Sequence, residues 1–430
     1  MTPVGEPAAS AFPPRVTAWR STVILAAIGF FLSMDAMLTV VLIEPVKHDM
    51  GLSDVQIALL QGTAFGLAFG ISSIPLGRLV DRTNRVRVLL GAVVLWMLAM
   101  VGTGLASSFA VLVACRILLG VIAALLLPAA ISLIADLHPP ERRSLSTSLF
   151  AVGQAIGQSA GITVGGLAFA ALTEHGGAVA GLAPWRVLYI GAGALALLLL
   201  PLLLTVREPA RQEVATAART VWQAMKDLWA HRALLGPILL AAMFAQMGSQ
   251  ATAVWTIPIL ERVHHQAPGQ YAGWFGPLVL AVSVAGALAG GQLGEFGRRR
   301  AGRAGVVIPG LVAALLLVPL SLFPLAPTLP TFALALGADM LLAAIVVTVI
   351  VVAIAMILPN EIRGLALGAN IFVSAVVGTA GSPLLTALVS KSLGGEAHLS
   401  AAVAVVSVPF VLLTAGCFAL ALRNGRREVV

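Results

Sequence analysis

The sequence predicts an all-α membrane protein in which twelve transmembrane helices form two pseudo-symmetric six-helix bundles. Three observations support this class: the composition, the length of the apolar stretches and an internal repeat. Of the 430 residues, 59% are apolar and 10% are charged, whereas soluble domains are about 45–50% apolar and about 25% charged. So few charges do not cover a water-facing surface, which excludes a soluble enzyme, a disordered chain and a coiled coil.

The apolar stretches are long and continuous, so we expect helices rather than strands. A helix needs about 20 residues to cross the hydrocarbon core. Breaks at charged residues, Pro and Gly divide the chain into twelve stretches of this kind. The predicted spans are residues 21–43, 55–76, 87–106, 109–135, 145–172, 185–205, 234–260, 271–293, 304–325, 329–358, 364–390 and 399–422.

Lys and Arg predict the orientation, because they gather in cytoplasmic loops. With both termini in the cytoplasm, 21 of the 26 basic residues lie inside and four lie outside. We therefore expect a multi-pass protein of the inner or plasma membrane with two cytoplasmic termini. The predicted parts are a cytoplasmic tail over 1–20, a six-helix bundle over 21–205, a cytoplasmic linker over 206–233, a second bundle over 234–422 and a cytoplasmic tail over 423–430.

Two pairs of matching segments indicate that the second bundle duplicates the first. Segment 77–81 (Gly-Arg-Leu-Val-Asp) closes span two, and segment 291–295 (Gly-Gln-Leu-Gly-Glu) closes span eight. Segment 139–143 (Pro-Pro-Glu-Arg-Arg) follows span four, and segment 359–363 (Pro-Asn-Glu-Ile-Arg) follows span ten. The offsets are 214 and 220 residues, so both matches occur in the same order. Parallel repeats of this kind are typical of transporters.

Segment 77–85 (Gly-Arg-Leu-Val-Asp-Arg-Thr-Asn-Arg) resembles the cytoplasmic loop motif of the major facilitator superfamily, and it lies between spans two and three as that motif does. The residues of the predicted cytoplasmic gate are Gly77, Asp81, Arg82, Arg85 and Asp136. Asp81 would accept hydrogen bonds from the positive end of a neighbouring helix, and Arg82 or Arg85 would pair with Asp136. Such contacts would hold the halves together at the inner face only while the carrier is open to the outside. The alternative is that these charges only set the topology.

Segments 43–56 and 139–143 resemble the spinster-like branch of that superfamily. The branch resembles exporters of lysophospholipids and sphingoid lipids, so the resemblance implies an amphiphilic substrate. Spinster-like proteins typically carry an Arg directly after the Asp of the first span and a Glu in the fourth span. Ala36 and Ala123 occupy these positions here, so the acidic pair that the branch uses for proton coupling is incomplete.

Three ionisable residues lie deep in the predicted spans: Asp35, Arg116 and Asp339. An isolated charge at a helix centre costs about 2.5–3.5 kcal/mol to insert. Asp35 and Arg116 lie about 10–12 Å below the outer face, and Asp339 lies near the repeat position of Arg116. We expect the three charges to outline a polar cavity between the halves. Either Asp35 exchanges a proton beside Arg116, or Arg116 holds an anionic head group, or the two form a static pair. Asp339 alternatively faces water at the outer mouth.

Polar residues four positions apart are further candidates for the cavity wall, because residues i and i+4 share a helix face. They are Gln246 and Gln250 in span seven, Gln154 and Gln158 in span five, and Asn370 and Ser374 in span eleven. Each pair either contacts a ligand or forms hydrogen bonds between helices. Glycine recurs every fourth residue in 62–70, 153–165 and 286–294. In the superfamily these helices lie between the halves, where flat faces suit rocking.

These features predict a monomeric secondary transporter that works by alternating access among membrane lipids. We expect proton-coupled export of an amphiphilic or lysolipid-like substrate. The alternatives are uptake of small organic anions with Arg116 as the anchor, multidrug efflux, and a gradient-independent lipid facilitator.

Enzymatic activity, a cofactor and a metal are not expected. The sequence has no recognisable nucleophile–base pair and no phosphate-cradling Gly-Lys-Ser/Thr segment. His264 and His265 adjoin without a second ligand pair. The basic residues are spread over the inner loops without interleaved aromatic residues, so nucleic-acid binding is not expected either.

Overall fold

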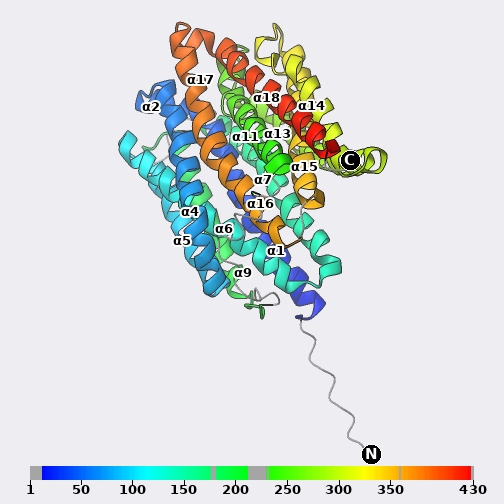
Figure 1. The fold of residues 1–430 in the computed structure, drawn as a ribbon. Helices are drawn as coiled ribbons and strands as arrows, with labels where there is room; N and C mark the ends of the chain where they lie inside the picture. The colour runs from blue at the N-terminus through cyan, green and yellow to red at the C-terminus, as the bar shows by residue number, and fades with distance from the viewer. Residues whose placement is uncertain (1–11, 176–180, 212–228, 230–231, 358–359, 428–430) are drawn as a thin grey trace, which may run out of the picture.

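The computed structural model describes residues 12–175, 181–211, 229, 232–357 and 360–427. Within these ranges every regular element is a helix, and twelve helices are long and apolar enough to cross a membrane (Figure 1). The predicted all-α class and the predicted number of spans are therefore confirmed. The predicted linker over 206–233 falls mostly outside the described residues, as do residues 1–11 and 428–430 of the two predicted tails.

The first six spans are separated by short connections, and two of these connections provide the N-cap of the helix that follows. Asn84 accepts a hydrogen bond from the N–H of Arg87, and Ser108 accepts one from the N–H of Val111, so each caps the helix that follows it. The elements are α1 (Arg15–Val41), α2 (Ile43–Met50), α3 (Asp54–Ala58), η1 (Leu59–Ala64), α4 (Phe65–Arg82), α5 (Arg85–Gly104), α6 (Phe109–Leu137), α7 (Pro140–Glu174), α8 (Pro184–Leu195), η2 (Ala196–Leu198) and α9 (Leu199–Leu204).

The second six spans include three that are interrupted. Span seven breaks between α11 and α12, span nine ends in a turn before η4, and span eleven contains a π-helical turn, η5. The elements are α11 (Arg232–Ala253), α12 (Thr256–Arg262), α13 (Pro268–Ala301), η3 (Arg303–Val307), α14 (Ile308–Leu320), η4 (Phe323–Leu325), α15 (Leu329–Ile357), α16 (Asn360–Val373), η5 (Ser374–Thr379), α17 (Ala380–Ser392), η6 (Glu396–His398) and α18 (Leu399–Arg427).

Several helices extend past the apolar stretches from which they were predicted. Helix α1 begins at Arg15 rather than at residue 21, and α4 continues to Arg82 rather than ending at residue 76. Arg78 and Asp81 are exposed on the added turns of α4. Charged residues end the apolar stretch but not the helix, because they project into water beyond the hydrocarbon.

An even number of spans places both ends of the chain at the same end of the bundle, which we call the terminal end. Helix α1 begins there and α18 ends there. The opposite end, which we call the distal end, carries α2 (Figure 1). Helices α12 and η6 lie beside α2 there, because Arg262 binds Glu44 and Glu396 binds Lys47.

Two seams join the halves: α7 packs against α13, and η1 with α4 packs against η5 with α17. Glycine makes the second seam possible. A Cβ atom on Gly62 would lie 2.7 Å from the carbonyl oxygen of Thr379, and one on Gly66 would lie 2.9 Å from the backbone nitrogen of Ala380. The backbones of spans two and eleven therefore touch directly.

The other two glycine runs do not lie mainly in a seam, contrary to prediction. A Cβ atom on Gly153 would lie 2.5 Å from the carbonyl oxygen of Ala26 in α1, within the same half. One on Gly290 would lie 2.7 Å from Cβ of Thr348 in α15, again within one half. Spacing identifies a flat helix face, but it does not identify the neighbour that the face meets.

Candidate functional site

Two adjoining cavities lie between the halves. One has a volume of about 250 Å³ and is lined by α1, η1, α4 and α6 of the first half and by α11 of the second. The other, of about 270 Å³, is lined by α4 of the first half and by α11, α15, α16 and η5 of the second. Phe65, Phe69 and Thr379 line both. We call the first the acid–base cavity and the second the amide cavity, after the polar residues described below.

Asp35 lies in the middle of α1 and is 4% exposed. Its Oδ2 atom accepts a hydrogen bond from Nε1 of Trp96 in α5, at 3.3 Å. Its Oδ1 atom is buried and has no hydrogen-bond partner among the described residues. A carboxyl group with one long hydrogen bond is poorly compensated when it is charged, and acids of this kind inside membranes mark ion pathways and proton relays.

Arg116 enters the same cavity from α6. Its Nη2 atom donates hydrogen bonds to Oγ1 of Thr39 at 2.5 Å and to the hydroxyl of Tyr189 at 3.0 Å. Thr39 lies one turn after Asp35 on α1, so Arg116 binds the helix that carries the acid rather than the acid itself. Within the described contacts, Asp35 and Arg116 do not form an ion pair, and Nε and Nη1 of Arg116 have no protein partner.

Among the described residues that line the acid–base cavity, Asp35 is the only acid and Arg116 is the only base. Ala36 and Ala123 line the same cavity. Ala36 and Ala123, at which the sequence departs from the typical spinster-like pattern, therefore add apolar wall beside the charges. Most of the remaining wall is also apolar.

Three of the predicted amide side chains line the cavities. Gln250 lies in the wall of the acid–base cavity, and Gln246 and Asn370 lie in the wall of the amide cavity. Gln154 and Gln158 of α7 line neither cavity, and Gln154 packs beside Gly29 of α1. Helix α7 presents this face to α1, which is a direction that residue spacing alone does not reveal.

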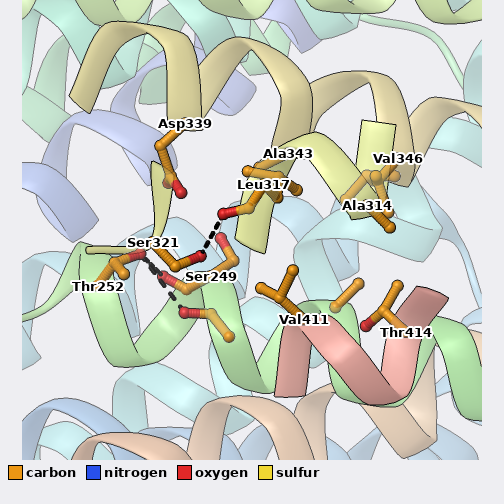
Figure 2. Close-up of a pocket in the computed structure, with 13 residues that line it drawn as sticks. Ser249, Thr252, Ala314, Leu317, Ser321, Asp339, Ala343, Val346, Val411 and Thr414 are labelled. Atoms are coloured by element: carbon orange, nitrogen blue, oxygen red, sulfur yellow. Dashed lines mark hydrogen bonds between the residues drawn. The ribbon is translucent and has the colours of Figure 1, made fainter. Parts of the chain in front are cut away.

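The prediction that Asp339 shares a cavity with Asp35 and Arg116 is wrong. Asp339, 6% exposed, lines a separate pocket formed only by residues of the second half (Figure 2). Its depth was estimated from the repeat, but depth does not say which way a side chain points. Helix α15 turns this position toward the interior of its own bundle.

Four residues of the acid–base site were not singled out from the sequence: Thr39, Gln61, Trp96 and Tyr189. Gln61 donates from Nε2 to the carbonyl oxygen of Thr39 at 3.1 Å. A signal existed for Thr39, since it follows Asp35 by four residues and so shares its helix face. The side chains of Trp96 and Tyr189 are buried in other spans, and the sequence does not indicate which way they point.

Five charged residues close the distal end, and we call them the distal cluster. They are Glu44, Lys47 and Asp54 of the first half and Arg262 and Glu396 of the second. Arg262 donates two hydrogen bonds of 2.8 Å to the two carboxylate oxygens of Asp54, and its Nη2 lies 2.6 Å from Oε1 of Glu44. Lys47 lies 2.7 Å from Asp54 and 2.5 Å from Glu396. The cluster therefore ties the halves together by ion pairs in both directions.

Burial strengthens this closure. The side chains of Glu44, Lys47 and Asp54 are 9% exposed or less, and that of Arg262 is 16% exposed. Charges hidden to this degree need their partners, because removal of one leaves the others buried and uncompensated. Opening of the distal end would require the contacts of Arg262 with Glu44 and Asp54 and that of Lys47 with Glu396 to break together.

The charges at the terminal end have a different arrangement. Arg85 is fully buried and donates to Asp136 at 2.5 Å and to Glu208 at 2.7 Å. The predicted contact between Arg85 and Asp136 is present. Arg85 and Asp136 belong to the first half and Glu208 to the start of the predicted linker that follows it, so these ion pairs do not reach the second half. Asp81 and Arg82 of the predicted gate are exposed, and the structure does not bring them into this cluster.

Twelve apolar helices around cavities walled by both halves, with a buried acid and base inside and an ion-paired closure at one end, define a membrane transport protein. The chain belongs to the Major Facilitator Superfamily, whose family model matches residues 25–322. An MFS-type efflux pump of Mycolicibacterium smegmatis is 27% identical over 96% of this chain and 94% of that protein. The multidrug export protein EmrB of Escherichia coli is 29% identical over 34% of this chain and 28% of EmrB.

Solved structures give the same assignment. A bacterial homologue of the human lysosomal transporter Spinster, in an inward-facing and unoccupied conformation, matches with a TM-score of 0.82 and 22% identity over 97% of this chain and 99% of that one. A D-xylose–proton symporter matches with a TM-score of 0.64 and 20% identity over 92% and 97% of the two chains. The predicted superfamily and the resemblance to its spinster-like branch are therefore confirmed at the level of the fold.

Proposed function

We propose that this protein is a proton-coupled transporter that exports an amphiphilic or lysolipid-like molecule. The observation that carries the proposal is the acid–base cavity, in which one carboxyl group and one guanidinium group lie in an apolar wall. The wall suits an apolar tail, and the free N–H groups of Arg116 suit a negatively charged group at the end of that tail. The relative described as an efflux pump over nearly its whole length supports the outward direction.

Asp35 is the group that we assign to proton coupling. It lies in the same cavity as Arg116 without an ion pair, so a substrate head group that binds Arg116 changes the electrostatic environment of Asp35. Proton and substrate then influence each other through one small space, which is what coupling requires.

Alternating access follows from the distal cluster. The excess of Lys and Arg at the terminal end supports a cytoplasmic location for both termini, and the distal end then faces outward. The structure would correspond to an inward-facing state, held by the ion pairs between Arg262 and the acids of the first half. Breaking them would open the cavity outward, while the exposed Asp81 and Arg82 would close the terminal end. We propose that one chain suffices as a monomer in the lipid bilayer of the inner or plasma membrane.

The test uses the purified full-length chain in proteoliposomes with an imposed pH gradient. A fluorescent lysophosphatidylcholine serves as the amphiphile and succinate as the small organic anion. We expect the gradient to drive movement of the amphiphile, and we expect Asp35→Asn to abolish the response to the gradient. Glu174→Gln, which removes an exposed carboxylate at the end of α7, is the matched control and should behave as the wild type.

The outcomes separate the alternatives. Amphiphile movement that ignores the gradient in the wild type would indicate a lipid facilitator and overturn proton coupling. Gradient-driven movement of succinate but not of the amphiphile would indicate uptake of small anions with Arg116 as the anchor. Transport of many unrelated amphiphiles at similar rates would indicate multidrug efflux.

A further inference from the structure

The pocket that holds Asp339 is formed by the second half alone, and a few polar side chains lie in its mostly apolar wall. Helices α11, α14, α15 and α18 form it, and Figure 2 shows Asp339 beside Ser321 and Thr252. Its polar lining also includes Ser249 and Thr414. Among its described lining residues there is no Lys, Arg or His, and no hydrogen bond of the described residues reaches the carboxylate of Asp339. The negative charge of Asp339 is therefore not balanced by protein.

The hydroxyl protons of Thr252, Ser321 and Thr414 are already donated to backbone carbonyl oxygens, so these three groups do not stabilise Asp339. Thr252 donates to the carbonyl oxygen of Ser249 at 2.9 Å, Ser321 to that of Leu317 at 2.9 Å, and Thr414 to that of Phe410 at 2.8 Å. A hydroxyl has a single proton and two lone pairs. The oxygens of Thr252 and Ser321, which lie beside Asp339 in Figure 2, therefore offer only lone pairs to the pocket, and no described hydrogen bond joins a hydroxyl to the carboxylate of Asp339.

Breaks in two helices occur beside these acceptor oxygens. Helix α11 ends at Ala253, directly after Thr252, and α14 ends at Leu320, directly before Ser321. Interrupted membrane helices are the places where transport proteins coordinate small cations, because unwound backbone and helix ends expose oxygen atoms. The two breaks are observed independently of the charge of Asp339.

The size of the pocket limits what can occupy it. The volume is about 30 Å³, which is room for one species the size of a water molecule. A bare proton needs no such space, and an organic cation does not fit. We propose that this pocket binds a single dehydrated Na⁺ ion beside Asp339, with the carboxylate of Asp339 and the hydroxyl oxygens of Ser249, Thr252 and Ser321 as its ligands. The site is distinct from the acid–base cavity, and Na⁺ binding is a property beyond the proposed proton-coupled export.

Direct binding tests this site without any transport. Purified full-length protein in detergent is titrated with radioactive Na⁺ in choline chloride buffer. We expect a single saturable site in the wild type and an affinity at least about tenfold lower in Asp339→Asn, because the ligand charge is lost. Ser321→Ala removes one hydroxyl oxygen beside Asp339, so it should lower the affinity by about threefold. The matched control is Glu174→Gln, which removes an exposed carboxylate and should bind Na⁺ as the wild type does.

Each outcome of the Na⁺ titration either supports or overturns the proposed site. Absence of saturable Na⁺ binding in the wild type between pH 6 and pH 9 would overturn the proposal and would assign any titration of Asp339 to a proton. Unchanged binding in Asp339→Asn would overturn it as well, as would an equal loss in Glu174→Gln. If Asp339→Asn does not elute as a folded monomer, the affinities of Ser321→Ala and Ser249→Ala decide, and wild-type affinity in both would overturn it. None of these results bears on pH-driven transport, which is measured separately.

Discussion

Both halves of the molecule bury an acid in the middle of a span, and the two acids have opposite surroundings. Asp35 in the first half accepts a hydrogen bond from Trp96 and shares its cavity with Arg116. Asp339 in the second half faces hydroxyl oxygens whose protons are donated elsewhere, and its described lining includes no base. Residue type and depth are nearly the same, so the neighbours must determine what each acid does.

The two halves can also be compared by whether their buried charges have protein partners. Other buried charges of the first half have partners, such as Arg85 with Asp136 and Lys47 with Asp54. A charge that has a protein partner can be stable with no ligand bound, and the cycle can break the pair and form it again. A charge without one needs a proton or a cation from solution. Loss of a partner should therefore harm the first half, whereas loss of the acid should relieve the second.

The largest effect is expected when Asp35 loses its only base. Arg116→Leu removes the guanidinium and leaves Thr39 and Tyr189 without their donor. Loss of one partner of a buried charged network costs about 3–5 kcal/mol, so the initial rate of pH-driven amphiphile transport should fall by about 100-fold or more. Arg116→Lys keeps the charge and should retain an intermediate rate. A rate for Arg116→Leu within about threefold of the wild type would show that the acid does not depend on the base.

The second largest effect is expected at the distal cluster. Arg262→Ala leaves Glu44 and Asp54 buried without their main partner, at a cost of about 3–5 kcal/mol to the closed distal end. The population should therefore shift toward the outward-open state. Val254 lines the acid–base cavity, so a Val254→Cys reporter should react with an impermeant maleimide from the distal side about tenfold faster or more in the Arg262→Ala background.

The reporter experiment needs two controls. Cys115 and Cys417 are replaced by Ser first, so that the reporter is the only thiol. Arg298→Ala removes an exposed arginine that pairs with Glu295 and should leave the labelling rate within about twofold, because exposed ion pairs contribute little. If Arg262→Ala labels no faster than this control, the distal cluster does not hold the gate.

The sequence predicts how deep a residue lies in the membrane, but it does not predict the direction in which the side chain points. The twelve spans could be predicted, and so could the location of Asp35 and Arg116 in one cavity, because helix geometry converts residue number into depth. Asp339 and Gln154 were misplaced because depth leaves the rotation of a helix undetermined. The distal cluster was missed because its partners are far apart in the chain: Arg262 and Glu44 are separated by 218 residues, and Lys47 and Glu396 by 349.

An effect of opposite sign is expected for the unpaired acid. In sodium-free buffer at pH 8, Asp339→Asn replaces an uncompensated carboxylate by a neutral group of the same shape. Relief of this desolvation, about 1–3 kcal/mol, should raise the melting temperature in detergent by about 2–6 °C. Saturating Na⁺ should raise the melting temperature of the wild type and not that of the variant. A lower melting temperature for Asp339→Asn without Na⁺ would mean that protein groups already stabilise the charge.

The smallest effect is expected on the half-saturating amphiphile concentration when one of two glutamines from the same sequence pattern is replaced. Gln250 lines the acid–base cavity, whereas Gln154 lies against α1 and lines neither cavity. A ligand hydrogen bond contributes about 0.5–1.5 kcal/mol, so Gln250→Ala should raise the half-saturating amphiphile concentration by about threefold to tenfold. Gln154→Ala should change it by less than about twofold. Equal effects of the two substitutions on half-saturation would show that substrate affinity depends on helix packing as much as on the cavity wall, and the assignment of Gln250 to the site would then be wrong.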